Sequence, residues 1–515
     1  MGLFTYNVFL HPLRSYPGPK MWAAFRFPTV YCGIKGILPM QIKALHDQYG
    51  PVVRIAPNEL AYTTAAAWKD IYGFRPGQLQ NPKDQRALPA PHKGQAVSVI
   101  RADDADHSRQ RRLLSHAFSA KALEEQQPLI MFYVDLLIRR LRENAAQPQN
   151  MVAWYNWTTF DVIGDLTFGE PFHCLQDQGW HPWVLTITEG LQAGGFIAAL
   201  SRYGLEFAMQ FLVPKAKLDK FHRMWVYVKE KVGARLARST ERPDFTTYIM
   251  RNDKEGRQMS KAEIEANAEL LIVAGSETTA SLIAGATYYL CVNPDALARV
   301  TAEVRGTFDN DQDIQINSVN KLSYLLAVLN EALRIYPPAP SSIPRITLKG
   351  DMISGQWVPP GVSKSNHMAC EASWAYEVHR QPSASFSSPP STLPPISMIL
   401  NHSCRSAGSL IHLPSSARTT KMWCRLLALD PGTVWAKGAF FPRPCSLAIR
   451  ARADDIADKQ NSLAYLEMRL IMAKVLWNFD LAIEEGSRNW KDQKAHLIWT
   501  KGPLMVKLTP VKRTE

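Results

Sequence analysis

The sequence predicts a domain that is mainly α-helical with a small β region. Helical periodicity dominates from about residue 100 to 310, and short strand-like segments lie on either side of the helical part of the chain. The chain has 515 residues, of which 46% are hydrophobic, so it can bury a large core. We expect one domain over residues 1–515, with an aberrant segment at 371–460.

The N-terminal part is expected to contain a loop and a small hairpin. Residues 1–25 are rich in proline, which favours a loop that enters the fold. Residues 51–63 alternate around Asn58-Glu59, which is typical of a hairpin. Further on, residues 194–214 are apolar but broken by charges, which indicates a core helix pair or a surface that dips into a bilayer interface.

The remaining elements follow from periodicity and from proline and glycine positions. Predicted helices cover residues 108–119, 121–144, 151–168, 215–238, 260–292, 294–306 and 318–335. Short strands are expected near 343–348 and 355–358. A strongly amphipathic helix begins at Leu463, and the tail 491–509 has the pattern of a hairpin.

The helix at 260–292 has clear signals at both ends. Ser260 and Glu263 have the spacing of a capping box. Asn293-Pro294 ends the helix, because the residue before proline is disfavoured in the helical region. At about 1.5 Å per residue, such a helix crosses a large domain.

The middle of this helix holds residues that are poor helix formers or costly to bury. They are Ala274, Gly275, Ser276, Glu277, Thr278 and Thr279. A glycine beside a hydroxyl that bonds back to a carbonyl favours a local opening of the helix. Two interpretations stay open: a groove that handles a small ligand and protons, or a glycine that admits a neighbouring helix next to an ordinary paired acid.

Composition disfavours several classes of protein. The net charge of +13 is diffuse, with no dense Lys/Arg run, so no nucleic acid partner is expected. An acidic protein or an anionic membrane face suits it better, and a charge that serves only solubility is the alternative. Seven scattered cysteines form no disulfide framework and favour a reducing compartment. No long apolar run opens the chain, so we expect neither an N-terminal anchor nor a signal peptide.

Glu331 and Arg334 are three residues apart on the helix predicted at 318–335, so they share a face. A surface ion pair at this spacing would contribute less than ~1 kcal/mol. The surrounding residues are apolar, and Pro337-Pro338 follows. We therefore expect a buried, structural pair.

These two segments together resemble the cytochrome P-450 superfamily of haem-thiolate monooxygenases. Residues 274–279 are similar to its oxygen-activation motif, and residues 331–334 are similar to its Glu-x-x-Arg motif. The hinge around His11-Pro12 is similar to that of fungal members of secondary metabolism, such as trichothecene hydroxylases. The resemblance covers about residues 1–370 and 462–510, and it implies a cytochrome P-450 fold.

The resemblance also implies a site built around haem b. Glu277 and Thr278 would be catalytic and relay protons to bound dioxygen. The residues that would bind the cofactor are His107, Arg111, Ala274, Gly275 and Arg345. The two arginines would pair with haem propionates as planar donors. Glu331 and Arg334 would hold the fold.

One part of the chain departs from the family pattern. The signature loop Phe-x-x-Gly-x-Arg-x-Cys-x-Gly is absent, and Asp458 stands where the ligand cysteine is expected. Cys445, about thirteen residues earlier, is the expected iron ligand, and Cys404 and Cys424 are weaker candidates. We interpret residues 371–460 either as a misread part of the gene, through a frameshift or a retained intron, or as a disordered segment. The alternative is a real protein that has diverged from the family.

The implied activity is insertion of one oxygen atom of O2 into a hydrophobic small molecule, by hydroxylation or epoxidation, in fungal secondary metabolism. Electrons would come from NADPH through NADPH-cytochrome P-450 reductase. The implied location is the surface of the endoplasmic reticulum membrane, with peripheral contact and no anchor in this chain. The rival hypotheses are a catalytically inactive relative and a non-catalytic protein that binds an apolar ligand or haem.

Overall fold

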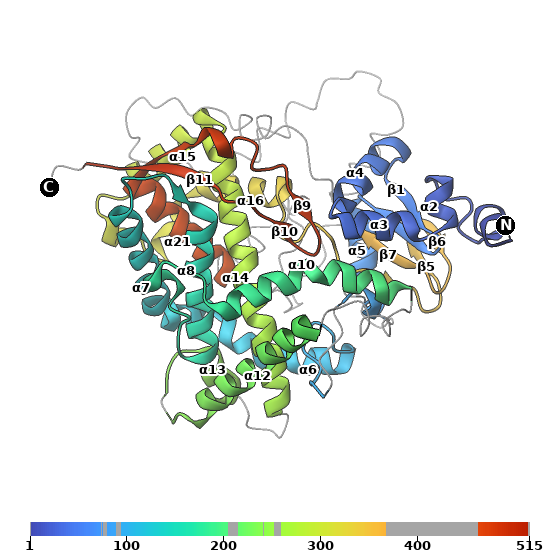
Figure 1. Cartoon of the computed structure of the whole chain (residues 1–515), viewed down its shortest axis with the longest axis horizontal. Helices are drawn as coiled ribbons and strands as arrows, with labels where there is room; N and C mark the ends of the chain where they lie inside the picture. The colour runs from blue at the N-terminus through green and yellow to red at the C-terminus, as the bar shows by residue number, and fades with distance from the viewer. Residues whose placement is uncertain are drawn as a thin grey trace, which may run out of the picture. The chain divides into compact units, whose positions relative to one another are not determined.

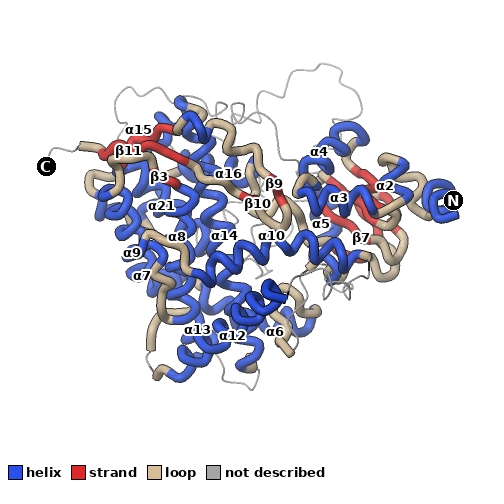
Figure 2. The backbone as a smooth tube through the Cα atoms, in the orientation of Figure 1, coloured by secondary structure: helices blue, strands red, loops and turns tan. Residues whose placement is uncertain are grey.

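The computed structural model describes residues 2–73, 75, 80–88, 94–203, 215–239, 241–251, 259–366 and 462–512. All of these belong to one compact unit that spans Met1–Val378 and Gly438–Glu515. The described part is mostly helical with four small sheets (Figures 1 and 2), which confirms the predicted mainly α fold with a small β region. The single-domain assignment and the aberrant segment at 371–460 stay predictions, because that segment lies outside the described residues.

The large helices form the main hydrophobic core. They are α7 Ala120–Glu143, α8 Met151–Phe168, α10 Pro182–Arg202, α12 Lys215–Ala237, α14 Lys261–Cys291, α15 Pro294–Thr307, α16 Ser323–Ile335 and α21 Leu463–Asn478. Helix α14 contacts α8, α12, α16 and α21, and its path between these neighbours can be followed in Figure 1. Within the described ranges, α14 alone is long and apolar enough to cross a membrane, but 72% of its apolar window is buried, so it is a core helix.

Shorter helices complete the described part. They are α1 Gly2–Thr5, a π-helix Tyr6–Leu10, α2 Lys20–Ala24, α3 Phe27–Lys35, α4 Leu38–Tyr49, α5 Ala65–Tyr72, α6 Asp104–Ser115, α9 Cys174–Asp177, α13 Phe245–Arg251 and the 3-10 turns Gln85–Ala87, His116–Phe118, Asp311–Asp313, Ser318–Lys321 and Glu485–Ser487. The expected loop over residues 1–25 is therefore wrong in part. Asn7 is buried, donates a 2.8 Å hydrogen bond to the Ala24 carbonyl, and accepts one of 2.9 Å from Arg54 at its own carbonyl. These contacts order the N-terminal turns.

The largest sheet has four strands in the order β1-β2-β7-β4. Its strands are β1 Val52–Ala56, β2 Glu59–Tyr62, β7 Ser363–Asn366 and β4 Arg345–Ile346. Strands β2 and β7 are parallel, and the other pairs are antiparallel. This confirms the predicted hairpin at 51–63. Beside it, β5 Asp351–Ile353 pairs with β6 Gln356–Val358.

The tail differs from the predicted 491–509 hairpin. Strands β9 Lys494–Ala495 and β10 Trp499–Thr500 form a short hairpin. Strand β11 Met505–Pro510 instead pairs with β8 Phe479–Ile483 and with β3 Gln149–Asn150. The backbone groups of β11 thus find partners that are distant in sequence, which a local alternation pattern cannot reveal.

Most predicted helices are confirmed within a few residues, including the one at 151–168. The helix predicted at 318–335 is split, because a 3-10 turn at Ser318–Lys321 precedes α16. The helix pair predicted at 194–214 is a single helix as far as Arg202; residues 204–214 lie outside the described residues.

Candidate active site

The capping box of α14 forms as predicted. Ser260 Oγ accepts a hydrogen bond from the Glu263 amide, and the Glu263 carboxylate accepts one from the Ser260 amide. The predicted local opening in the middle of α14 is wrong, because the helix is continuous over Lys261–Cys291. The Thr278 hydroxyl donates a 2.6 Å hydrogen bond to the Ala274 carbonyl, so the hydroxyl is satisfied without breaking the helix.

The middle of α14 is partly exposed along an otherwise buried stretch. Val273, Ala274 and Thr278 are partly exposed, whereas Ser276 and Thr279 are buried. Ala274 and Thr278 are four residues apart and therefore lie on the same face of the helix. The Thr278 side chain thus lies on a partly exposed side of the helix.

Glu277 is buried on the same helix and is paired with a cation from the C-terminal hairpin. The side chains of Glu277 and Lys501 are each 5% exposed. Lys501 Nζ donates hydrogen bonds to Glu277 Oε1 and, at 2.5 Å, to Ser281 Oγ. A buried carboxylate is costly without such a partner, so this contact explains how the apolar helix tolerates the acid. Nothing in the sequence around Lys501 predicts it.

Gly275 lies where α14 meets α8. A Cβ atom at this position would stand 2.6 Å from Cδ1 of Ile163 and 2.9 Å from its Cγ1. A side chain here would force the Ile163 side chain to shift, so glycine favours the close approach of the two helices. The geometry favours the packing interpretation of Gly275, and a role of Gly275 and Ala274 toward a cofactor stays a prediction.

The predicted cofactor-binding cations come together from separate elements. His107 and Arg111 lie one turn apart on α6, and Arg345 lies on β4. Lys83, which the sequence did not indicate, forms an isolated β-bridge with Arg345. Its Nζ donates to the carbonyls of Val99 and Ala102 at 3.3 and 3.4 Å.

The protonation of this cluster shows that positive charge is crowded there. Burial, followed by the charges of Lys83, Arg111 and Arg345, lowers the pKa of His107 to about 4. Burial, followed by the charge of Arg345, lowers the pKa of Lys83 to about 8. Burial also lowers the pKa of Arg345. Each shift means that the charged form is disfavoured, and an anion placed among these groups would reverse that.

The charges of this cluster can be compared with those of haem, the cofactor that the sequence implies. Haem carries two propionates, and a partly buried group of basic side chains with crowded positive charge is the donor set that such carboxylates need. Asp104 is the acid whose charge acts on Lys83, His107 and Arg345. On the propionate side, the residues present fit the cofactor.

Glu331 and Arg334 on α16 form the predicted pair. Arg334 Nε donates to Glu331 Oε2 at 2.8 Å, and Arg334 Nη2 donates to Oε1 at 2.7 Å. The side chains are 7% and 17% exposed. This bidentate geometry is the strong form of an arginine–carboxylate contact, and it agrees with the expected structural pair.

The cysteines of the described part are poor candidates for an iron ligand. Burial raises the pKa of Cys174 and of Cys291 to about 12 and also raises that of Cys32, so each is held as a thiol. In the ranges described, no group of three or more His, Cys, Asp or Glu side chains could hold a metal ion. The predicted ligand Cys445 and the weaker candidates Cys404 and Cys424 lie outside the described residues.

Comparisons with known proteins show the family to which the chain belongs. The sequence pattern described as cytochrome P-450 matches residues 14–364. The chain is 40% identical to cytochrome P-450 monooxygenase astJ of Aspergillus oryzae, over 98% of this chain and 94% of that protein. It is 39% identical to cytochrome P-450 monooxygenase astA of Talaromyces wortmannii, over 99% and 94%, and 37% identical to averantin hydroxylase of Dothistroma septosporum, over 98% and 88%. The chain therefore belongs to the cytochrome P-450 family.

Proposed function

We propose that this haem-dependent monooxygenase hydroxylates or epoxidises a hydrophobic small molecule of fungal secondary metabolism. One oxygen atom of O2 enters the substrate and the other leaves as water, with two electrons and two protons consumed. The observation that carries the proposal is the centre of α14, where the partly exposed Thr278 follows the buried Glu277. Relatives named as monooxygenases and as averantin hydroxylase support it.

Haem b with a thiolate ligand supplies the electron density that favours O–O cleavage. In this chain His107, Arg111 and Arg345 would hold its propionates, and Lys83 would add a further hydrogen-bond donor. The bound carboxylates would relieve the repulsion among these groups. The pKa of His107 and that of Lys83 would then rise when haem binds.

The proton-handling groups would be Thr278 and Glu277. Thr278 Oγ1 can pass on its own proton while it receives another, because a hydroxyl both donates and accepts. Glu277 would supply that proton, and water would then restore it. The hydrogen bond from Thr278 to the Ala274 carbonyl fixes the direction of the hydroxyl.

The iron ligand and its loop belong to the segment at 371–460. We propose Cys445 as the ligand of the chain as written, and a frameshift or a retained intron as the origin of the segment. The family match ends at residue 364, whereas the alignments with astJ and astA cover 98% and 99% of the chain. A transcript that reproduces residues 365–465 as given would refute the misread-gene interpretation.

Members of this family take their electrons from a redox partner. We propose NADPH-cytochrome P-450 reductase for this chain, at the surface of the endoplasmic reticulum with peripheral membrane contact. The net charge of +13 suits both an acidic partner surface and an anionic membrane face.

The experiment is expression of the full chain together with a fungal reductase. We expect the reduced protein with CO to absorb at the thiolate position. We also expect 18O from 18O2 in an NADPH-dependent product of a hydrophobic substrate. Absence of both the absorbance and the product would refute the function and favour the inactive relative. Haem binding without product would favour the non-catalytic binding protein.

A further inference from the structure

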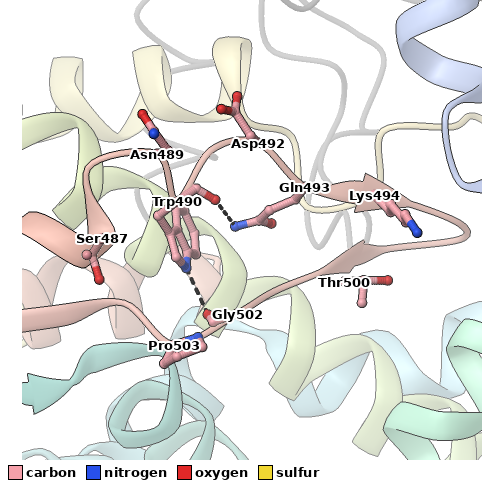
Figure 3. Close-up of a pocket in the computed structure, with 10 residues that line it drawn as sticks. Ser487, Asn489, Trp490, Asp492, Gln493, Lys494, Thr500, Gly502 and Pro503 are labelled. Atoms are coloured by element: carbon pink, nitrogen blue, oxygen red, sulfur yellow. Dashed lines mark hydrogen bonds between the residues drawn. The ribbon is translucent and has the colours of Figure 1, made fainter.

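Lys501 lies in a hairpin that is tied to the rest of the protein on both sides. The Trp490 indole donates a 2.8 Å hydrogen bond to the Gly502 carbonyl, next to Lys501 (Figure 3). The Trp499 indole donates one of 2.7 Å to the Pro337 carbonyl, which follows α16. Trp499 also stacks on Tyr336 at 4.8 Å between ring centroids. The backbone that carries Lys501 is therefore held in place independently of Glu277.

The Lys501 side chain reaches a single acid from this fixed position. In the described structure, Nζ contacts Glu277 and Ser281 on α14, and no other carboxylate lies within ion-pairing distance. Both charged side chains are 5% exposed, so the ammonium group and the carboxylate both lose their hydration when the pair forms. Because neither charge is hydrated, removing one partner leaves the other buried and uncompensated, so the state of Glu277 depends on Lys501.

The pair also orients the carboxylate. Glu277 and Ser281 are four residues apart and share one face of α14, and the Ser281 hydroxyl lies 3.4 Å from Glu277 Oε1. Thr278 is the next residue along, about 100° around the helix, and its hydroxyl is directed to the Ala274 carbonyl. The carboxylate thus faces Ser281 and Lys501, away from the hydroxyl to which it would pass a proton.

We propose that Lys501 is a positioning residue that controls when Glu277 can deliver a proton. While it is paired, the Glu277 side chain is held by Lys501 and Ser281 and faces away from Thr278. Delivery then requires the pair to open and the carboxyl group to take a proton from water. That proton passes to Thr278 Oγ1 as the hydroxyl hands on its own, and the carboxylate returns to Lys501. This inference rests on the proposed function, since it assigns a step within the same reaction.

The pairing itself is tested without any turnover, by unfolding the full chain in urea between pH 5 and 8. In Lys501→Met, the buried Glu277 loses its cation and takes up a proton that the unfolded chain does not hold above about pH 4.3. The urea midpoint of this variant should therefore fall as pH rises. Adding Glu277→Gln should remove that dependence. If Lys501→Met shows no added pH dependence, or if the two changes are additive, the pair does not exist in solution and the inference fails.

The matched control is Lys474→Met. Lys474 is 2% exposed and donates to Asp135 and Asp311, far from α14 in sequence. Its two acids are 51% and 34% exposed, so they stay hydrated as carboxylates after the substitution. This control should lower the urea midpoint by a similar amount at every pH. A pH dependence equal to that of Lys501→Met would mean that any buried lysine gives the same signal, and would overturn the assignment.

The positioning role is tested in the haem-loaded enzyme by the share of NADPH electrons recovered in product rather than in peroxide. In the parent this share should fall as pH rises, because the donor must be protonated. Lys501→Met should shift the falling limb to higher pH, and Lys501→Arg should restore the parent profile. A folded Lys501→Met variant with the parent profile would overturn the role. If the parent forms no product, the proposed function fails, and the urea experiment still decides whether the pair exists.

Discussion

The bidentate pair between Glu331 and Arg334 allows a quantitative test of its structural role. Glu331→Ala removes both hydrogen bonds to Arg334 and leaves the guanidinium, only 17% exposed, without its carboxylate. Removing one partner of a buried ion pair costs about 3–5 kcal/mol. Because Arg334 retains some exposure and makes a further interaction, we expect the lower end, about 3 kcal/mol.

The control is a pair of the same spacing on a helix surface. Arg140 and Glu143 on α7 are also three residues apart and share a single hydrogen bond of 2.9 Å. Their side chains are 28% and 46% exposed, so water replaces the contact. Glu143→Ala should therefore cost less than about 1 kcal/mol.

The measurements are soluble yield, haem content per chain and the urea midpoint. A loss of about 3 kcal/mol is a large part of the 5–15 kcal/mol by which proteins are usually stable. Glu331→Ala should therefore give little soluble, haem-loaded protein, and Glu331→Gln, which keeps the shape, should be intermediate. Equal yields, haem contents and midpoints for Glu331→Ala and Glu143→Ala would refute the structural assignment.

Three further predictions concern single residues. Thr278→Ala should leave the fold and substrate binding intact but divert NADPH electrons to peroxide; product formation equal to the parent would contradict its role. Burial raises the pKa of Glu467 to about 8, so the folded state keeps a proton that the unfolded state loses near 4.5. The stability that this proton gives is present below pH 4.5 and is lost as pH rises to 8, and Glu467→Gln should flatten the urea midpoint over that range. Cys445→Ser should abolish the CO absorbance at the thiolate position, and a retained band would move the ligand to Cys404 or Cys424.

The elements that depend on neighbours in sequence could be predicted. Helix α14 was predicted from its capping box and its proline stop, which act within about four residues. The hairpin of β1 and β2 was visible from local alternation. The N-terminal turns and the pairing of β11 were missed, because their partners, such as Ala24 for Asn7 and β8 for β11, are set by tertiary packing.

The candidate site shows the same division between local and distant partners. A carboxylate in the apolar middle of α14 requires a cation. The sequence of the helix predicts this requirement, but it does not predict which residue provides the cation. The chain has 59 lysines and arginines, and the one that pairs with Glu277 lies 224 positions away. Lys83 is likewise brought to Arg345 by a backbone bridge that no motif encodes. The motifs thus define which charges must be compensated, and only the packing of the hairpin against α14 and of residue 83 against β4 decides which side chains do so.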